Sequence, residues 1–533
     1  MQINKTIDIE LSERQQLAFD LYREGKNIYV TGPGGSGKSA LIKKIYEDAV
    51  AREKNIQVTA LTGCASLLLG CRAKTLHRWS GIGLGSKSIE FNVQRIMDKK
   101  KYSMRGVRDV WRKTDILVVD EVSMLSLKLF DMLNQIGKTV RGNQRPFGGI
   151  QVIFLGDFYQ LPPVGDKEEE DTSRFCFESE EWSRVFEKEH QIPLTKIFRQ
   201  TDMTYCNLLN QIREGVIKKS TCKLLENYVG RVIPVDSNIR PTKLFPTRNK
   251  VDMINHLEMN KLKGTLYEFK MKEVSDYPLT SEFDKARKKD TDLRDIQSEL
   301  NYMSINLPCV SGLSLKVGAQ VMCVVNKEMN TLSGKVIALC NGSQGVVVDI
   351  SIVMGNPLPV VRFLIRGSYE DVIMVRHDWV SDNIPGVGIS QIPLILAWAL
   401  TIHKAQGATL DIAEIDIGSG IFECGQTYVA LSRVRSLEGL YLNSFDPSKI
   451  RISRKVKTFY DDLMAFWETC PSSVVYLKEK EKEKEKEKEK EKEKIPIATP
   501  VLVSVVQGEK NPFQEFAYEN NIPVVTAELV IEP

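Results

Sequence analysis

The segment that most constrains the fold of this chain is a glycine-rich loop, Gly32-Pro-Gly-Gly-Ser-Gly-Lys-Ser39. It follows four strand-like residues, 28–31, and precedes residues 40–50, whose composition favours a helix. Between a strand and a helix, such a loop turns its backbone N–H groups toward phosphate oxygens, and the N-terminus of the helix adds its dipole. The pattern therefore predicts an α/β domain that binds a nucleoside triphosphate.

The residue types in the loop match the chemistry of the phosphates. Lys38 is expected to reach the β and γ phosphates, and the Ser39 hydroxyl is expected to coordinate Mg²⁺. The predicted cofactors are ATP and Mg²⁺, and the predicted nucleotide-binding residues in this loop are Gly32, Pro33, Gly34, Gly35, Ser36, Gly37, Lys38 and Ser39.

Two further apolar runs end in polar residues that a nucleotide site needs. Residues 116–119 lead into Asp120 and Glu121, and residues 151–156 lead into a segment that contains Gln160. Ligands of open α/β sheets lie at the carboxyl ends of the strands. Asp120 is therefore expected to bind Mg²⁺, Glu121 to act as general base on the attacking water, and Gln160 to contact the γ-phosphate.

The chain of 533 residues is long enough for two or three domains. Changes in motif content and composition along the chain predict a first domain at 1–195, a second at 196–470, and a C-terminal tail at 471–533. Residues 478–494 of the tail alternate Lys and Glu. Short β-type runs at about 311–380 predict a small barrel inserted in the second domain. Residues 264–305 are charged and irregular, and we expect a surface connection there.

Charge and cysteine content restrict the class of protein. A net charge of +4 means that any surface for nucleic acid is a local groove. Ten cysteines without a CxxC pair favour a reducing, intracellular compartment. The first residues resemble neither a signal nor a transit peptide, and no apolar run is long enough for a membrane span. We therefore expect a soluble intracellular protein without a membrane partner.

Together these blocks resemble superfamily-one helicases, and within them the group named for petite integration frequency, with bacterial RecD as a more distant relative. The resemblance covers about residues 10–465 and rests on blocks in the family order at 11–16, 59–65, 75–83, 120–124, 146–151, 156–163, 194–200, 401–410 and 428–434. It implies two RecA-like P-loop domains, parallel sheets with flanking helices, and an SH3-like barrel insertion in the second.

The resemblance also assigns roles to residues that the local pattern leaves open. Gln15 would read adenine, and Arg199 and Arg433 would act as arginine fingers, each typically worth about 10³–10⁵ in rate. The residues expected to contact DNA are Thr75, His77, Trp79, His403, Lys404 and Thr409. Residues 95–113 are locally basic, and they could bind phosphates or form a solvated helix face.

The resemblance implies a monomeric motor that moves 5′→3′ on single-stranded DNA, unwinds duplex or forked DNA, and acts where DNA is replicated, repaired or recombined, as in the nucleus. The tail could bind protein partners. Three alternatives stay open: an RNA helicase of the same superfamily, a scaffold switched by nucleotide, and a RecD-like subunit coupled to a nuclease.

Overall fold

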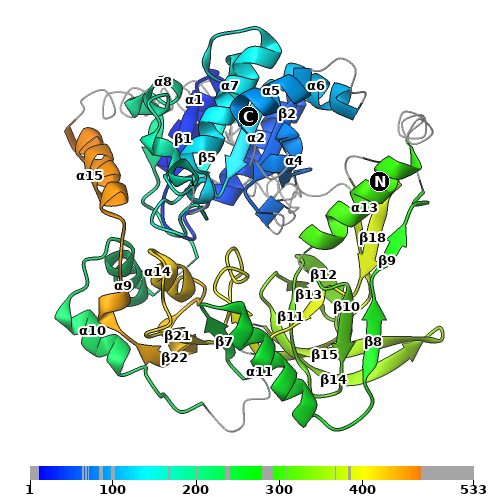
Figure 1. The fold of residues 1–533 in the computed structure, drawn as a ribbon. Coiled ribbons are helices and arrows are strands. Elements are labelled where there is room, and N and C mark those ends of the chain that lie inside the picture. The colour runs from blue at the N-terminus through cyan, green and yellow to red at the C-terminus, as the bar shows by residue number, and fades with distance from the viewer. Residues whose placement is uncertain are drawn as a thin grey trace, which may run out of the picture. The chain divides into compact units, whose positions relative to one another are not determined.

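The computed structural model describes residues 11–469 except 63–64, 67–68, 70, 83–87, 98–102, 166–168, 200–201, 234–239, 279–291, 308, 366–367, 382–383 and 385. The predicted tail at 471–533, with its Lys-Glu repeat, and part of the basic segment 95–113 lie outside this range. Within it the fold is α/β with parallel sheets, as the sequence predicted (Figure 1).

The first sheet has six parallel strands in the order β3-β2-β4-β5-β1-β6. We call it the N-terminal sheet. Its strands are β1 (Ile28–Thr31), β2 (Ile56–Ala60), β3 (Lys74–Thr75), β4 (Ile116–Asp120), β5 (Gln151–Gly156) and β6 (Gln191–Pro193). Strands β1 and β4 are buried along their whole length, as continuous apolar runs in parallel sheets are. The carboxyl ends of β1, β4 and β5 meet at one edge.

The helices of this region connect the strands. They are α1 (Glu13–Arg23), α2 (Lys38–Ala51), α4 (Leu76–Ser80), α5 (Ile89–Met97), α6 (Ser103–Lys113), α7 (Leu127–Arg141) and α8 (Trp182–Val185). Short 3₁₀ turns lie at Val122–Met124, Pro146–Gly149, Glu170–Thr172, Cys176–Glu178 and Lys188–His190. Helix α7 has defined ends because the Ser126 hydroxyl accepts a hydrogen bond from the Leu129 N–H and Gly142 follows in the left-handed conformation.

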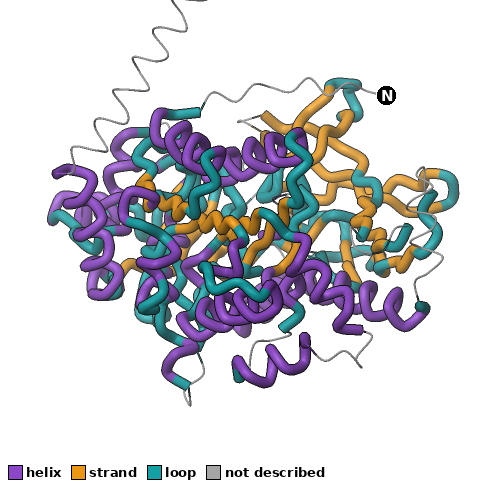
Figure 2. Tube along the Cα trace, turned by 90° about the horizontal axis from the view of Figure 1, so that it is seen from above, coloured by secondary structure: helices purple, strands orange, loops and turns teal. Residues whose placement is uncertain are grey.

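The second parallel sheet, which we call the C-terminal sheet, has the order β20-β7-β21-β22. Its strands are β7 (Thr242–Phe245), β20 (Ala399–Thr401), β21 (Ala413–Ile417) and β22 (Leu440–Phe445). The helices of this region are α9 (Met203–Arg213), α10 (Lys219–Glu226), α11 (Arg248–Lys261), α14 (Gln426–Leu431) and α15 (Arg454–Thr469), and short 3₁₀ turns lie at Leu437–Gly439 and Pro447–Lys449. In Figure 2, helices lie on both sides of a central run of strands.

Antiparallel strands and α13 lie between α11 and β20, and we call this segment the insertion. It contains β8 (Tyr267–Lys270), β9 (Lys272–Val274), α13 (Leu293–Asn306), β10 (Gly312–Leu315), β11 (Gln320–Cys323), β12 (Lys327–Asn330), β13 (Val336–Leu339), β14 (Gln344–Val353), β15 (Asn356–Ile365), β16 (Ser368–Ile373), β17 (His377–Val380), β18 (Gly388–Gln391) and β19 (Leu394–Leu396). Its largest sheet has the order β16-β15-β14-β11-β19.

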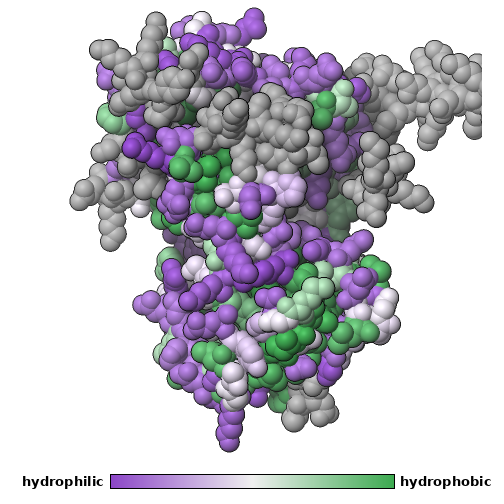
Figure 3. Space-filling view, turned by 90° about the vertical axis from the view of Figure 1, so that its right-hand side faces the viewer, coloured by the Kyte–Doolittle hydropathy of each residue, from purple (hydrophilic) through white to green (hydrophobic). Residues whose placement is uncertain are grey.

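The expectation of an irregular connection at 264–305 is wrong for the part of that range that the structure describes. Strand β8 pairs with β10, β9 pairs with β18, and α13 packs against β18. These partners are far away in the sequence, so local composition did not reveal them. The insertion also exposes several large hydrophobic side chains, among them those of Leu332, Ile352 and Met354. In Figure 3, hydrophobic residues gather in the lower half of the view.

Helix α15 follows the C-terminal sheet in sequence but packs on the N-terminal sheet. The Phe459 ring stacks on Phe177 with a centroid distance of 4.5 Å, and it lies edge-on to Phe158 at 5.4 Å. The Tyr460 hydroxyl is 2.5 Å from the Thr31 hydroxyl, at the end of β1. The chain therefore returns to the strand that leads into the glycine-rich loop.

Candidate nucleotide and nucleic-acid site

The glycine-rich loop runs from β1 to α2 through backbone conformations that favour glycine. Gly35 and Gly37 have φ angles of 86° and 82°. A Cβ atom on Gly37 would lie only 2.5 Å from Nε2 of Gln15, so a side chain there would displace Gln15. The loop thus keeps its backbone accessible at the N-terminus of α2, as a phosphate site requires.

Lys38 lies at the start of α2, and its ammonium group is held by the loop. Nζ donates hydrogen bonds to the carbonyl oxygens of Gly32 at 2.7 Å and Pro33 at 3.1 Å. Burial lowers the pKa of Lys38, while nearby carboxylates, foremost those of Asp157 and Glu121, act in the opposite direction. The predicted cation therefore lies among acidic groups from the ends of β4 and β5.

Gln15 joins α1 to the same loop. Its Nε2 donates to the carbonyl oxygens of Ser36 at 3.3 Å and Gly37 at 3.2 Å, and its Oε1 accepts a hydrogen bond from the Ser12 N–H at 2.9 Å. The side chain is 2% exposed. These contacts place Gln15 beside the phosphate loop, and its expected role in reading adenine stays a prediction.

The acidic pair follows β4 at the same edge of the sheet. Burial, followed by the negative charge of Glu121, raises the pKa of Asp120 to about 7. Glu121 adopts the left-handed conformation with φ 56°, which is uncommon for a residue with a side chain and is typical of functional positions. A divalent cation would favour the charged form of Asp120, and the exposed Ser39 hydroxyl offers a second oxygen ligand, so these residues fit Mg²⁺.

Two arginines from the C-terminal half lie at this site. Arg433 follows α14, is 2% exposed, and its Nη2 would be 3.7 Å from a Cβ atom on Gly34 of the loop. Arg199 donates from Nη1 to the carbonyl oxygen of Ser432, next to Arg433, at 3.4 Å. The structure therefore brings together both arginines that the sequence selected from blocks 234 residues apart.

The two guanidinium groups repel each other. Burial, followed by the charge of Arg199, lowers the pKa of Arg433 to about 10, and burial lowers the pKa of Arg199. The negative charge of Glu121 counteracts this effect on the pKa of both groups. The negative charge of one carboxylate, Glu121, does not neutralise two buried guanidinium groups. A bound anion such as a triphosphate would supply the remaining negative charge.

Three further contacts bring the C-terminal half to the nucleotide site, through residues of that half to which the sequence analysis assigned no role. The Tyr428 hydroxyl accepts a hydrogen bond from the Gly34 N–H at 2.9 Å. Nε2 of Gln406 donates to Oε2 of Glu121 at 3.2 Å. A Cβ atom on Gly425 would lie 2.6 Å from the carbonyl oxygen of Gln160. Gln160 itself is buried, with 6% of its surface exposed.

The comparisons with known proteins agree on one family. Its profile, described as PIF1-like helicase, matches residues 10–223. The ATP-dependent DNA helicase RRM3 of Saccharomyces cerevisiae is 34% identical over 517 residues, which cover 85% of this chain and 67% of that protein. The crystal structure of Pif1 helicase from Candida albicans is 34% identical and has a TM-score of 0.64, covering 85% of this chain and 100% of that one. This chain belongs to the PIF1-like helicase family.

A solved structure of a bacterial family member includes its nucleic acid. The crystal structure of Bacteroides Pif1 bound to single-stranded DNA is 29% identical to this chain with a TM-score of 0.56, and it covers 86% of this chain and 98% of that one. The present PIF1-like chain spans 64–67% of the length of the curated relatives it matches first. The correspondence is therefore with the shared helicase core.

The predicted DNA-contacting residues of this PIF1-like chain differ in exposure. His403 and Lys404 are exposed, and His77 and Thr409 are half-buried. The hydroxyl of Thr75, which is 6% exposed, accepts a hydrogen bond from the Arg78 N–H and so caps α4.

Trp79 is 2% exposed and packs on Trp111 with a centroid distance of 4.3 Å. In this structure neither ring has a free face for a base, so a stacking role for Trp79 is not supported. The tryptophan pair instead supports the helix that carries His77.

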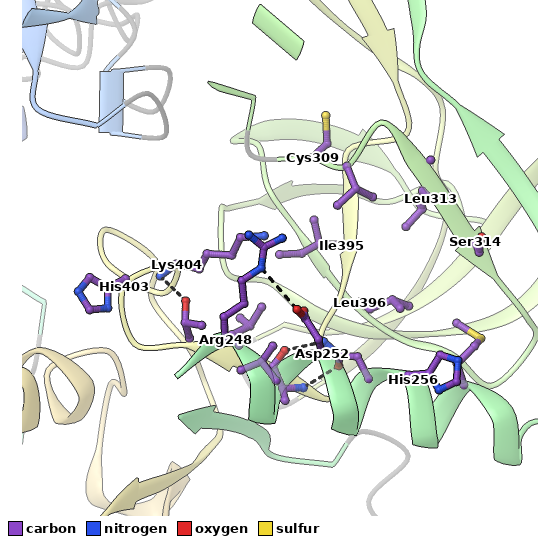
Figure 4. A pocket seen from close by; sticks show the side chains of 18 of the residues that line it. Arg248, Asp252, His256, Cys309, Leu313, Ser314, Ile395, Leu396, His403 and Lys404 are labelled. Atoms are coloured by element: carbon purple, nitrogen blue, oxygen red, sulfur yellow. Dashed lines mark hydrogen bonds and ion pairs between the residues drawn. The ribbon is translucent and has the colours of Figure 1, made fainter. Parts of the chain in front are cut away.

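A groove with a volume of about 870 Å³ begins at His403 and Lys404 (Figure 4). Helix α11 forms one wall with Arg248 and His256, and the other lining residues come from β20, β19, β10 and the residues before β10. Figure 4 shows His403 and Lys404 at one end and Ser314 near the other. The groove thus connects the second predicted DNA block with the insertion.

Helix α13 of the insertion reaches α4, because Glu299 forms an ion pair with Arg78. None of the helices in the part of the chain that the structure describes is long and apolar enough to cross a membrane.

Proposed function

We propose that this chain is an ATP-dependent DNA helicase that moves along single-stranded DNA and unwinds duplex DNA. One observation carries the proposal. Gln406 belongs to the same block as the exposed His403 and Lys404, and it donates a hydrogen bond to Glu121, the expected general base. A DNA strand bound by His403 and Lys404 would thus be linked through the side chain of Gln406 to Glu121, the group expected to activate water.

We assign the steps of ATP hydrolysis to residues that lie around the loop. Lys38 and the loop N–H groups bind the phosphates, Ser39 and Asp120 hold Mg²⁺, and Glu121 activates the water. When bound, Mg²⁺ neutralises charge on the phosphates. Gln160 contacts the γ-phosphate. Arg199 and Arg433 stabilise the charge that develops on the transferred phosphoryl group, each worth about 10³–10⁵ in rate.

Hydrolysis becomes movement because the site is built from both halves of the chain. The contacts of Arg433, Tyr428 and Gln406 with the loop and with Glu121 require the two parallel sheets to be close. After hydrolysis, loss of the γ-phosphate removes the anion that holds the arginines, and the halves can separate. Alternation between the two arrangements shifts one DNA-binding surface relative to the other.

The proposed DNA path uses Thr75 and His77 near the N-terminal sheet, and His403, Lys404 and Thr409 near the C-terminal one. The groove beside α11 extends this path toward the insertion, and Arg248 of α11, which forms an ion pair with Asp252, lines it. Single strands are held by contacts to backbone charge and by stacking on their bases, without regard to sequence. Resemblance to the family adds the 5′→3′ direction.

The finer architecture belongs to the same proposal. Two parallel sheets, the second interrupted in sequence by an antiparallel segment, support two RecA-like domains, at 1–195 and 196–470, with an SH3-like barrel in the second. We propose a monomer that acts on forked DNA at sites of replication or repair in the nucleus, and a tail that contacts protein partners.

The first experiment measures ATP hydrolysis by the wild type and by Lys38→Ala with no nucleic acid, with poly-dT and with poly-U. Unwinding is then followed on partial duplexes with a 5′ or a 3′ tail. The proposal expects stimulation by poly-dT, no activity in the variant, and unwinding from the 5′ tail. Hydrolysis indifferent to nucleic acid would favour a nucleotide-switched scaffold, and stimulation by poly-U alone would favour an RNA helicase.

A further inference from the structure

A buried ion pair joins the two halves of the chain beside the nucleotide loop. Arg213 is the last residue of α9, and Asp157 directly follows β5. Nε and Nη2 of Arg213 donate to Oδ2 and Oδ1 of Asp157 at 2.9 and 2.8 Å. The Asp157 side chain is fully buried, and that of Arg213 is 11% exposed. Burial alone would lower the pKa of Arg213, but Asp157 outweighs it and raises that pKa well above its ordinary value.

Two stacked tyrosines cover this ion pair. The rings of Tyr159 and Tyr460 lie 4.6 Å apart at an angle of 11°. The guanidinium carbon of Arg213 is 4.6 Å from the Tyr159 centroid and 5.2 Å from the Tyr460 centroid. A planar guanidinium fits both the carboxylate and the aromatic faces, which an ammonium group cannot do. The pair is therefore fixed in orientation as well as in distance.

The Tyr460 hydroxyl connects the pair to the nucleotide loop. It lies 2.5 Å from the hydroxyl of Thr31, the residue before the loop, accepts a hydrogen bond from the Phe158 N–H at 3.0 Å, and lies 3.3 Å from Oδ1 of Asp157. Burial raises the pKa of Tyr460, so the hydroxyl stays protonated. The ends of β1 and β5 thus share one buried hydroxyl from α15.

The same residues fix the turn that carries Gln160. The Gln160 N–H donates to the carbonyl oxygen of Asp157 at 2.8 Å, and the Tyr159 N–H lies 3.3 Å from the Asp157 carboxylate. On the other side, α9 is joined to α14 because the Tyr205 hydroxyl donates to the carbonyl oxygen of Leu431 at 2.6 Å. Helix α14 carries Tyr428 and leads into Arg433.

We infer that Arg213, Asp157 and Tyr460 form a coupling node, which positions the Gln160 turn and the α9–α14 unit relative to each other. The inference rests on the proposed function, because it assigns the node to the conversion of ATP hydrolysis into DNA movement. Separating a buried bidentate pair leaves an unpaired charge, so the node favours the arrangement in which the α9–α14 unit lies against the Gln160 turn. Its three members are positioning residues.

The test uses two conservative variants of the full chain, Arg213→Lys and Tyr460→Phe. Arg213→Lys keeps the charge but loses the bidentate geometry and the stacking, and Tyr460→Phe removes only the hydroxyl. Each is expected to lower kcat for hydrolysis stimulated by poly-dT by about 10- to 100-fold with little change in the KM for ATP, because the catalytic groups are misplaced. The ATP consumed per base pair unwound is expected to rise.

Matched controls separate positioning from stability. Arg141→Lys changes an arginine that donates to the carbonyl oxygens of Gly148 and Thr114, within the N-terminal half. Tyr22→Phe removes a buried hydroxyl that donates to Asp48. Melting temperatures are measured for all four variants, and the controls are expected to keep the wild-type ratio of ATP consumed to base pairs unwound.

Two outcomes have different meanings. If the wild type shows no hydrolysis stimulated by DNA, the proposed function itself fails. If the wild type is active and both node variants fold but keep its kcat and its ATP consumption per base pair, the node has no coupling role and the inference is overturned. Should Arg213→Lys fail to fold, Tyr460→Phe decides alone.

Discussion

The Tyr428 hydroxyl accepts a hydrogen bond from the Gly34 N–H at 2.9 Å, which ties α14 directly to the glycine-rich loop. Burial, followed by the charge of Asp157, raises the pKa of Tyr428 to about 12, so the group is a neutral hydroxyl at physiological pH. Its own proton can still be donated. Tyr428 therefore links the conformation of the loop to the position of α14 in the C-terminal half.

Replacing Tyr428 by Phe removes this bond while keeping the ring. A buried hydrogen bond is worth about 0.5–1.5 kcal/mol, so hydrolysis stimulated by poly-dT is expected to fall by about 2- to 10-fold. The control is Tyr22→Phe, which removes a buried hydroxyl bonded to Asp48 instead of to the loop. Equal rates for Tyr428→Phe and the wild type in a steady-state assay would show that the loop contact has no functional weight.

Gly425 is expected to tolerate no side chain when the halves close. A Cβ atom would lie 2.4 Å from the carbonyl oxygen of Tyr159, so Gly425→Ala should abolish hydrolysis while binding of a fluorescent ADP analogue persists. Gly230→Ala is the control, because Gly230 has a similar φ of 69° with nothing within 4 Å. That control isolates the strain of the left-handed backbone, about 1–2 kcal/mol. An active Gly425→Ala enzyme would contradict the closed arrangement.

Replacing Glu121 by Gln removes the expected general base and keeps the shape of the side chain. The rate of ATP hydrolysis should fall by about 10²–10⁴-fold, with binding of ATP retained. Glu187→Gln, at an exposed position of the N-terminal half, serves as the comparison. Hydrolysis within tenfold of the wild type would assign the base to another group.

Gln406→Ala removes the contact between the second DNA block and Glu121. A half-buried hydrogen bond to a carboxylate contributes only a modest free energy, because water competes for both groups. We therefore expect the rate of ATP hydrolysis with poly-dT to fall by about 5-fold. Hydrolysis without DNA should change less. The exposed Gln135→Ala variant provides the baseline. If Gln406→Ala lowers both rates equally, Gln406 supports catalysis without linking it to DNA.

The affinity for single-stranded DNA is expected to depend on pH through His403. Although His403 is exposed at the surface, partial desolvation of its ring lowers its pKa, and Glu423 acts in the opposite direction. The free histidine is therefore neutral at pH 7, whereas a bound phosphate favours the charged form and raises its pKa. Affinity for a dT oligomer should increase as pH falls from the raised pKa of the bound histidine to the lowered pKa of the free one, and then level off.

Fluorescence anisotropy from about pH 8 to about pH 5.5 measures this dependence. His403→Gln is expected to reduce the slope of affinity against pH. Part of that slope should remain because of His77, whose pKa is also lowered by burial. His377→Gln in the insertion should leave the slope unchanged. A slope that His403→Gln does not alter would exclude His403 from the phosphate contacts.

Much of the nucleotide site could be predicted because each piece is local. The strand 28–31, the glycines of the loop and the apolar strand before Asp120 are consecutive residues whose types follow from backbone conformation and phosphate charge. The structure has β1 at Ile28–Thr31 and β4 at Ile116–Asp120, where the sequence placed them. The resemblance to a known family then ordered the more distant blocks.

Other features depended on contacts between distant segments. Trp79 lies in a sequence block typical of a DNA contact, yet its ring lies in the core against Trp111. Burial removes the large apolar surface of the indole ring from water, and this stabilises the folded chain. Strands β8 and β9 form only because β10 and β18 are available to pair with them. Composition alone described that region as irregular.

The sequence by itself determined the phosphate loop, the parallel strands that end in acidic residues, and the family. Only the tertiary structure decided that Tyr428, Gln406 and Arg213 face groups of the N-terminal half. These residues are ordinary in their local sequence. Their roles come from distances of about 3 Å to Gly34, Glu121 and Asp157, which exist only once two sheets and α15 have packed together.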